Sequence, residues 1–225
     1  MMARVAVRYG TAIMVATPHR FYGGVENTPD TLRELTALVC RALKSTSFAH
    51  RFILLPGQEI PLRPETADEV LAGDVLTLGD HGKHVLVEPP FDRFPSWTAD
   101  AVRNIVAAGY VPVLAHPERN AKIQEDPQRV VELVDAGAIL QLTAMSIDGL
   151  NGSRAQTAAD WMLDRGLAGV VASDTHSPSW RPPNLRPAYY RLADRYGLDL
   201  ARRLCVETPK AIALGLETSL NRETK

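Results

Sequence analysis

Five apolar runs in this chain end on side chains that can bind a metal ion. The runs are IMVATPH, ILLPGQE, VLVE, VPVLAH and GVVASDTH, and the side chains are His19, Glu59, Glu88, His116, Asp174 and His176. In a barrel of parallel strands the carboxyl ends of all strands open onto one face. Residues that are distant in sequence would therefore meet in one pocket. Mixed imidazole and carboxylate ligands suit zinc, manganese and iron, so the pattern predicts a metal centre.

The context of each histidine decides how it is interpreted. A single histidine at a strand end is more often a packing or capping residue, so the hypothesis depends on the whole set. Asp174 and His176 support it, because alternate residues of an extended chain face the same side. His81 and His84 precede the strand that ends at Glu88. At about 3.3 Å per residue they lie roughly 13 Å from that end, which predicts a surface loop for both.

Two arginines follow the predicted strand ends. Arg119, in HPERN, lies just after His116, and its guanidinium could bind a tetrahedral oxyanion through two donors. The alternative is an ion pair with Glu118, and the phosphate role is favoured. Arg181, in WRPPN, is a second candidate for phosphate binding, although the prolines stiffen this loop whatever its role. Arg20 is a weaker candidate. We therefore expect Arg119 and His176 to be the catalytic side chains.

Short β-rich runs alternate with amphipathic segments, which is typical of βα units around a parallel sheet. The predicted strands span 11–17, 52–59, 84–88, 111–115, 138–142 and 168–173. The predicted helices span 29–44, 64–72, 97–109, 127–136, 153–165, 185–197, 199–206 and 208–216. Thr28-Pro29 and Thr208-Pro209 read as helix starts, and Gly109, Gly137 and Gly166 as helix ends. No linker divides the chain, so residues 1–225 are predicted to form one α/β domain.

The beginning of the chain does not fit a complete barrel. Residues 2–8 have the pattern of the last turns of a helix, and six strands are few for a closed barrel. We therefore expect the chain to start inside a βα unit, with the first strand missing.

Composition excludes several classes of protein. The 225 residues carry a net charge of −1, which gives no electrostatic case for nucleic acid or an anionic membrane. No apolar run reaches the roughly 18 residues that span a bilayer, and no signal peptide is evident. Cys40 and Cys205 lie in apolar helical patterns, so we expect buried thiols in a reducing cytoplasm. Neither has an arginine six positions later, which excludes a cysteine-nucleophile phosphate loop.

In this order and spacing, the segments ATPH, GQEI, VLVE, AHPERN, ASDTH and RPP resemble the bacterial tyrosine-protein phosphatases of the PHP superfamily. The similarity extends to the closing segment ETPKAIALG. It implies a distorted (β/α)7 TIM-like PHP barrel with two or three divalent ions, most often manganese, with iron and zinc as alternatives. It also implies dephosphorylation of tyrosines on kinases that control capsule or exopolysaccharide export. By position, the six ligand candidates match the family's metal ligands, and Arg119 matches its phosphate-binding arginine.

The sequence departs from this family at one motif. The family opens with a strand carrying H-x-H, whose histidines bind metal, and these 225 residues contain no H-x-H. The segment MMARVAVRYGTAIMVATPH aligns with the family's first helix and second strand. We expect that the start was placed at an internal methionine, and that the chain as given is impaired in metal binding and catalysis.

The sequence therefore predicts a metal-dependent phosphatase that acts on phosphotyrosine, with a bacterial tyrosine kinase tail as its partner. Water activated by the metals would attack phosphorus in line. Three alternatives stay open: a small-molecule phosphoesterase such as a histidinol phosphatase, a regulatory module that binds without turnover, and a metal-dependent amide hydrolase. Self-association is also left open.

Overall fold

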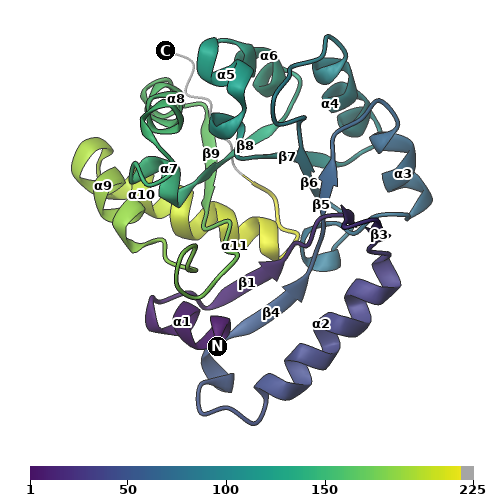
Figure 1. Ribbon diagram of the computed structural model, residues 1–225, viewed down its shortest axis with the longest axis vertical. Helices are drawn as coiled ribbons and strands as arrows, with labels where there is room; N and C mark the ends of the chain where they lie inside the picture. Colours follow the sequence, from purple (N-terminus) through teal and green to yellow (C-terminus); the bar gives the residue numbers. More distant parts are fainter. Residues whose placement is uncertain (219–225) are drawn as a thin grey trace.

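The computed structural model describes residues 1–218 and centres on a five-stranded parallel sheet. Its strands follow the chain order and are β5 (Glu59–Pro61), β6 (His84–Glu88), β7 (Val111–Ala115), β8 (Ile139–Thr143) and β9 (Ala168–Ala172). All four neighbouring pairs are parallel. The predicted alternation of strands and helices is therefore confirmed, and the strands curve around a common interior (Figure 1).

Two further strands, β1 (Ile13–Ala16) and β4 (Ile53–Pro56), form a separate parallel pair. An isolated parallel bridge between His19 and Glu59 joins the end of β1 to β5. The predicted strand 52–59 is thus two strands, β4 and β5, interrupted at Gly57 and Gln58. A Cβ at Gly57 would lie 2.6 Å from Val15 Cγ1, so glycine is needed where β1 passes this break.

Helices cover the outer face of the sheet (Figure 1). The main ones are α2 (Pro29–Leu43), α3 (Thr66–Ala72), α4 (Thr98–Ala107), α6 (Arg129–Asp135), α8 (Ser153–Asp164) and α9 (Arg186–Tyr196). The helix expected over residues 2–8 is α1 (Met2–Arg8), and short helices α5 (Ala121–Glu125) and α7 (Ala144–Ile147) were not predicted. The Thr28 hydroxyl accepts from Thr31 N–H at 3.4 Å, which confirms that cap. Gly109, Gly137 and Gly166 have positive φ, as their positions after helices require.

The C-terminal segment differs from its prediction at one boundary. Here α10 (Leu198–Arg202) leads through a π-helical turn (Arg203–Glu207) into α11 (Thr208–Ala213). Thr208 has helical dihedral angles, φ −63° and ψ −46°, so it is not the N-cap that the sequence suggested. The turn continues the helix without a break, and the proline after Thr208 is tolerated inside it.

The sheet is apolar on both faces, as expected for parallel strands with helices on the outside. Val85, Leu114 and Leu140 belong to the large core shared with the helices. Leu86, Val113 and Ile139 form a second cluster on the other face with Val170 and with Ile212 of α11. The C-terminal helix therefore packs against the inner face of the sheet.

His84 corrects one prediction. It is the first residue of β6 and is fully buried instead of lying in a surface loop, whereas His81 is exposed as predicted. Among the described residues, neither ring nitrogen of His84 has a hydrogen-bond partner. Burial lowers the pKa of His84 to about 4, so the ring is neutral at physiological pH.

Both cysteines were predicted to be buried. Cys205 is buried, whereas Cys40 is half-buried.

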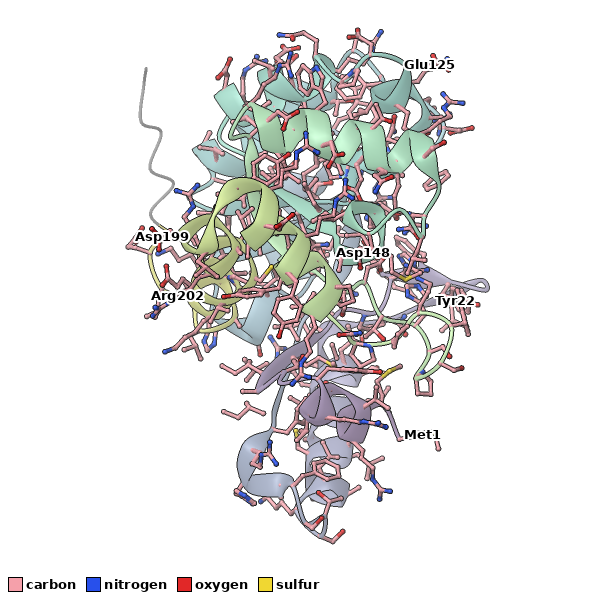
Figure 2. The ribbon with its side chains drawn as sticks, turned by 90° about the vertical axis from the view of Figure 1, so that its left-hand side faces the viewer. Met1, Tyr22, Glu125, Asp148, Asp199 and Arg202 are labelled. Carbon is pink, nitrogen blue, oxygen red and sulfur yellow. The ribbon has the colours of Figure 1, made fainter. Side chains whose placement is uncertain are left out.

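A small hairpin follows β1 and was not predicted. Its strands are β2 (Phe21–Tyr22) and β3 (Val25–Glu26), joined by two glycines with positive φ. Figure 2 shows Tyr22 on this hairpin, at the edge of the molecule and away from the helical layer. The hairpin begins two residues after His19, so it stands beside the predicted metal ligands.

Candidate metal centre

Four of the predicted ligands converge: His19 and Glu59 lie three residues beyond the ends of β1 and β4, and Glu88 and His116 lie at the ends of β6 and β7. His116 Nε2 lies 3.2 Å from Glu59 Oε1 and 3.5 Å from Glu88 Oε1. His19 Nδ1 lies 3.1 Å from Glu59 Oε2 and 3.8 Å from Glu88 Oε2. Each histidine therefore faces both carboxylates. Side chains that span almost 100 sequence positions form one compact group.

The strand register explains part of this convergence. Glu59 pairs with Leu86, so Glu88 lies two residues further along β6 and faces the same side of the sheet. Val87 of β6 pairs with Leu114 of β7, so strand alternation alone would direct His116 to the face opposite Glu88. The chain instead leaves β7 at His116 with φ 32°, and this turn brings the imidazole to the two carboxylates.

Asp174 and His176 follow β9 and lie with the two predicted arginines. Asp174 Oδ2 accepts a hydrogen bond from Arg119 Nη1 at 2.8 Å and a second from Arg181 Nη2. His176 Nδ1 lies 3.0 Å from the carbonyl oxygen of Asp174. Arg119 therefore pairs with Asp174, 55 positions away, and not with its neighbour Glu118.

The two groups act on one another electrostatically. The charge of His176 contributes to the pKa of Glu59, that of Asp174 to the pKa of His116, and that of Arg119 to the pKa of Glu88. The two groups are therefore close enough for the charges of one to influence the ionisation of the other.

The donor geometry fits a metal ion. One atom each from His19, Glu59 and Glu88 can be chosen so that all lie within 4.8 Å of one another. Ligands about 2.1 Å from a shared ion at roughly tetrahedral or octahedral angles are separated by about 3.0 to 3.4 Å. The histidine–carboxylate distances of 3.1 to 3.8 Å are close to that range. Imidazole and carboxylate donors favour zinc, manganese or iron over calcium.

The carboxylates differ in their protonation behaviour. Burial raises the pKa of Glu88, and the charge of Glu59 raises it further. Burial also acts to raise the pKa of Glu59, but the hydrogen bond and charge of His116 outweigh it and lower the pKa. Burial opposes the charging of His116, yet the hydrogen bond and charge of Glu59 raise its pKa. Two acids held this close favour a positive partner between them.

Two of the strand ends carry backbone strain. His116 has φ 32° and Asp174 has φ 48°, and both lie in the left-handed region that favours glycine. Such conformations cost free energy and tend to occur at functional sites. At both positions the chain leaves its strand and turns sharply, which aims the side chain across the sheet edge.

Glu118 is a supporting residue that sequence reasoning missed. It is fully buried, and one carboxylate oxygen accepts from Thr143 N–H at 3.0 Å and from the Ser146 hydroxyl at 2.7 Å. Burial raises the pKa of Glu118, and its charge acts on His116. Its position two residues after the candidate ligand His116 could have indicated this supporting role from the sequence. The sequence suggested only an ion pair with Arg119.

Arg20 has a structural role. It is buried, and its guanidinium pairs with Glu26 at 3.0 Å and with Glu69 at 2.8 Å. These contacts connect the β2–β3 hairpin to α3. The guanidinium of Arg20 is therefore engaged in structural ion pairs and is not available to bind phosphate.

A groove of about 600 Å³ opens below the ligands. It lies between β1 and β9, which share no ladder within residues 1–218. Val15, Leu86, Val113 and Val170 line its interior, so it is largely apolar. Its lining also includes His19, Glu59, Asp174 and His176. The candidate ligands therefore border an opening in the ring of strands.

A model of the family described as capsular polysaccharide synthesis, CpsB/CapC, matches residues 1–214. The chain belongs to the CpsB/CapC family. Tyrosine-protein phosphatase YwqE of Bacillus subtilis is 36% identical over 200 residues, which cover 88% of this chain and 77% of YwqE. Tyrosine-protein phosphatase CpsB of Streptococcus pneumoniae is 28% identical over 212 residues, which cover 92% of this chain and 86% of CpsB.

The family resemblance extends to the fold. A structure from crystallographic work on YwqE and CpsB superposes with a TM-score of 0.90 and 32% identity, covering 96% of this chain and 86% of the other. That work describes the two proteins as unique metal-dependent tyrosine phosphatases. The CpsB/CapC fold seen here is a mixed α/β fold with a parallel sheet. Within residues 1–218 it contains no helix long and apolar enough to span a membrane.

Proposed function

We propose that this CpsB/CapC family member is a metal-dependent protein-tyrosine phosphatase that acts in capsule or exopolysaccharide regulation. The observation that carries the proposal is the convergence of two histidines and two carboxylates beside two arginines at one strand-end rim. Its family membership and its similarity to YwqE and CpsB support the same activity.

His19, Glu59, Glu88, His116, Asp174 and His176 would hold the divalent ions, with manganese as the first choice and iron and zinc as alternatives. Such ions, when bound, supply Lewis acidity and a water acidic enough to attack phosphorus near neutral pH.

Arg119 and Arg181 would bind the equatorial oxygens of the phosphoryl group, where charge develops in the transition state. Both now donate to the same oxygen of Asp174, so a phosphate would compete for donors that are already directed to one point. His176 is held at Nδ1 by the Asp174 carbonyl, which leaves Nε2 free to bind a ligand or a proton. A tyrosine leaving group, with a pKa near 10, needs little help from a general acid.

We further infer a distorted (β/α)7 PHP-type barrel in which one more strand occupies the groove between β1 and β9. That groove passes beside His19 and Glu59, so an H-x-H on such a strand would add two imidazoles to the ligands. The substrate would be a phosphorylated tyrosine in the tail of a bacterial tyrosine kinase, in the cytoplasm.

The test compares hydrolysis of a phosphotyrosine peptide with that of histidinol phosphate, after loading with manganese, zinc or iron. We expect the peptide to be the better substrate and Glu59→Ala to abolish turnover. The same assays are repeated on a version with an H-x-H strand restored upstream, which should be more active. Absence of hydrolysis by the restored protein with all three metals would refute the enzymatic proposal, and preference for histidinol phosphate would favour a small-molecule phosphatase.

A second candidate function rests on the two arginines, which converge on one oxygen of Asp174 and could hold a phosphate without catalysis. The chain could bind phosphopeptides without turning them over. This alternative predicts tight phosphopeptide binding, no hydrolysis, and little effect of Glu59→Ala on the binding.

A further inference from the structure

Each of the two arginines at the candidate site lies against an exposed aromatic ring. The Cζ of Arg119 is 5.8 Å from the ring centroid of Phe91, and the Cζ of Arg181 is 5.6 Å from that of Trp180. Both arginines donate to the same oxygen of Asp174, so they are adjacent. Each ring therefore lies against an arginine that contacts the same carboxylate, which is where a phosphate would bind.

These rings are more exposed than their size would suggest. Phe91 is 54% exposed and Trp180 is 65% exposed. They come from different connections, Phe91 from the loop between β6 and α4 and Trp180 from the loop between β9 and α9. The Trp180 ring also lies 6.4 Å from the ring of the candidate ligand His176. Exposed apolar surface concentrated at the rim of a site indicates a binding surface.

A cation–π contact alone does not account for both positions. An arginine stacked on an exposed ring gains only a modest interaction in water, while the ring keeps most of its apolar surface hydrated. Phe21 gives a contrast within the same protein. It stacks with Arg20 and Arg63, of which Arg20 is buried and ion-paired with Glu26 and Glu69, so that contact is structural. Phe91 and Trp180 instead stack on arginines that face the metal ligands.

We propose that Phe91 and Trp180 form an aryl-binding rim that selects aromatic phosphate monoesters. The inference rests on the proposed function, because it requires Arg119 and Arg181 to hold the phosphoryl group. A phosphate bound there places its ester oxygen and the attached group beside the two rings. A phenyl ring can pack against them in offset or edge-to-face contact, whereas a serine or threonine side chain is too short and lacks the ring. Phe91 and Trp180 are thus specificity-determining residues for phosphotyrosine.

The test is a pair of binding measurements by calorimetry in the presence of manganese. Phenylphosphonate carries both the anion and the ring, and methylphosphonate carries the anion alone. We expect wild-type protein to bind phenylphosphonate more tightly. Phe91→Ala and Trp180→Ala should each weaken phenylphosphonate binding by about 2- to 12-fold, with little change for methylphosphonate. Trp180→Phe, which keeps a ring, should restore most of the loss.

Tyr190→Ala is the matched control. Tyr190 on α9 is 65% exposed like Trp180 and lines neither the groove nor the arginine cluster. Its removal should change neither affinity. A second readout is the ratio of kcat/KM for phosphotyrosine and phosphoserine peptides of one sequence, which should fall in both rim variants.

Two results would refute the aryl-binding rim. A third would show that the phosphate site of the proposed function is wrong. Equal weakening of both phosphonates would show that the rings only position the arginines. Unchanged phenylphosphonate affinity in the double variant would show that they make no contact with the ligand. If wild-type protein bound neither phosphonate, the phosphate site of the proposed function would fail, and the rim with it.

Discussion

The change Glu88→Gln should have opposite effects with and without a metal ion. The Glu88 carboxylate lies 3.5 Å from His116 and 3.8 Å from His19, and its side chain is 26% exposed. Burial and the charge of Glu59 both raise the pKa of Glu88, so the metal-free fold resists its ionisation. Glutamine has the same shape without the charge. Metal-free Glu88→Gln protein should therefore be at least as stable as the wild type.

A bound metal reverses the comparison, because glutamine is a poor ligand. At a manganese concentration of 100 times its Kd, wild-type protein gains about 2.7 kcal/mol in the free energy of unfolding. A chain of this length shifts by about 2 to 4 °C per kcal/mol, so Tm should rise by roughly 5 to 10 °C. If the variant binds 100-fold more weakly, the same concentration equals its Kd. The gain is then about 0.4 kcal/mol, or about 1 °C.

Thermal unfolding followed by fluorescence, with and without manganese, measures both effects. Glu34→Gln is the control, since Glu34 is an exposed acid on α2 and is not one of the candidate ligands. It should behave as the wild type in both conditions. The reasoning is refuted if Glu88→Gln keeps the full manganese shift. It is refuted equally if the metal-free variant melts several degrees below the wild type.

Three further predictions concern buried ionisable groups. Burial lowers the pKa of His84 from 6.5 to about 4, so the free energy of unfolding of the wild-type protein should fall by roughly 3 kcal/mol between pH 6.5 and pH 4. In urea titrations across that pH range, His84→Leu should lose correspondingly less. Burial raises the pKa of Asp148 from 3.8 to about 6, so Asp148→Asn should exceed the wild type by roughly 1 to 3 kcal/mol at pH 8 but show no gain at pH 4. Glu118→Ala leaves Thr143 N–H and the Ser146 hydroxyl without their acceptor and should cost about 2 to 4 kcal/mol in denaturant unfolding, whereas Glu118→Gln should retain most of the stability.

The strands of the main sheet could be predicted because they are buried on both faces. The run at 84–88 matches β6 at both ends, and 111–115 matches β7. The strand at 52–59 was wrong in one respect, since the break at Gly57 arises from contact with Val15 of a different strand. The β2–β3 hairpin gave no signal, because strands of two residues are too short to show an alternating pattern.

The candidate site was predictable where a ligand lies at the end of an apolar run or a few residues beyond a strand. His19, Glu59, Glu88 and His116 meet because parallel strands end on one side. The partner of Arg119 was not predictable, since Asp174 is 55 positions away and local sequence offers the nearer Glu118. His84 was misplaced for a similar reason. It precedes an apolar run, which suggested a loop, but tertiary packing covers it completely.

The positive φ angles of His116 and Asp174 have a consequence for engineering this protein. An L-residue with a side chain costs roughly 1 to 2 kcal/mol more than glycine in that backbone region. Glycine would relieve that strain at either site, but it would also remove a candidate ligand and the partner of buried or clustered charges: Glu59 would lose His116, and both arginines would lose Asp174. Loss of a buried charge partner costs about 3 to 5 kcal/mol, so stability selection and ligand binding should both retain the strained residues.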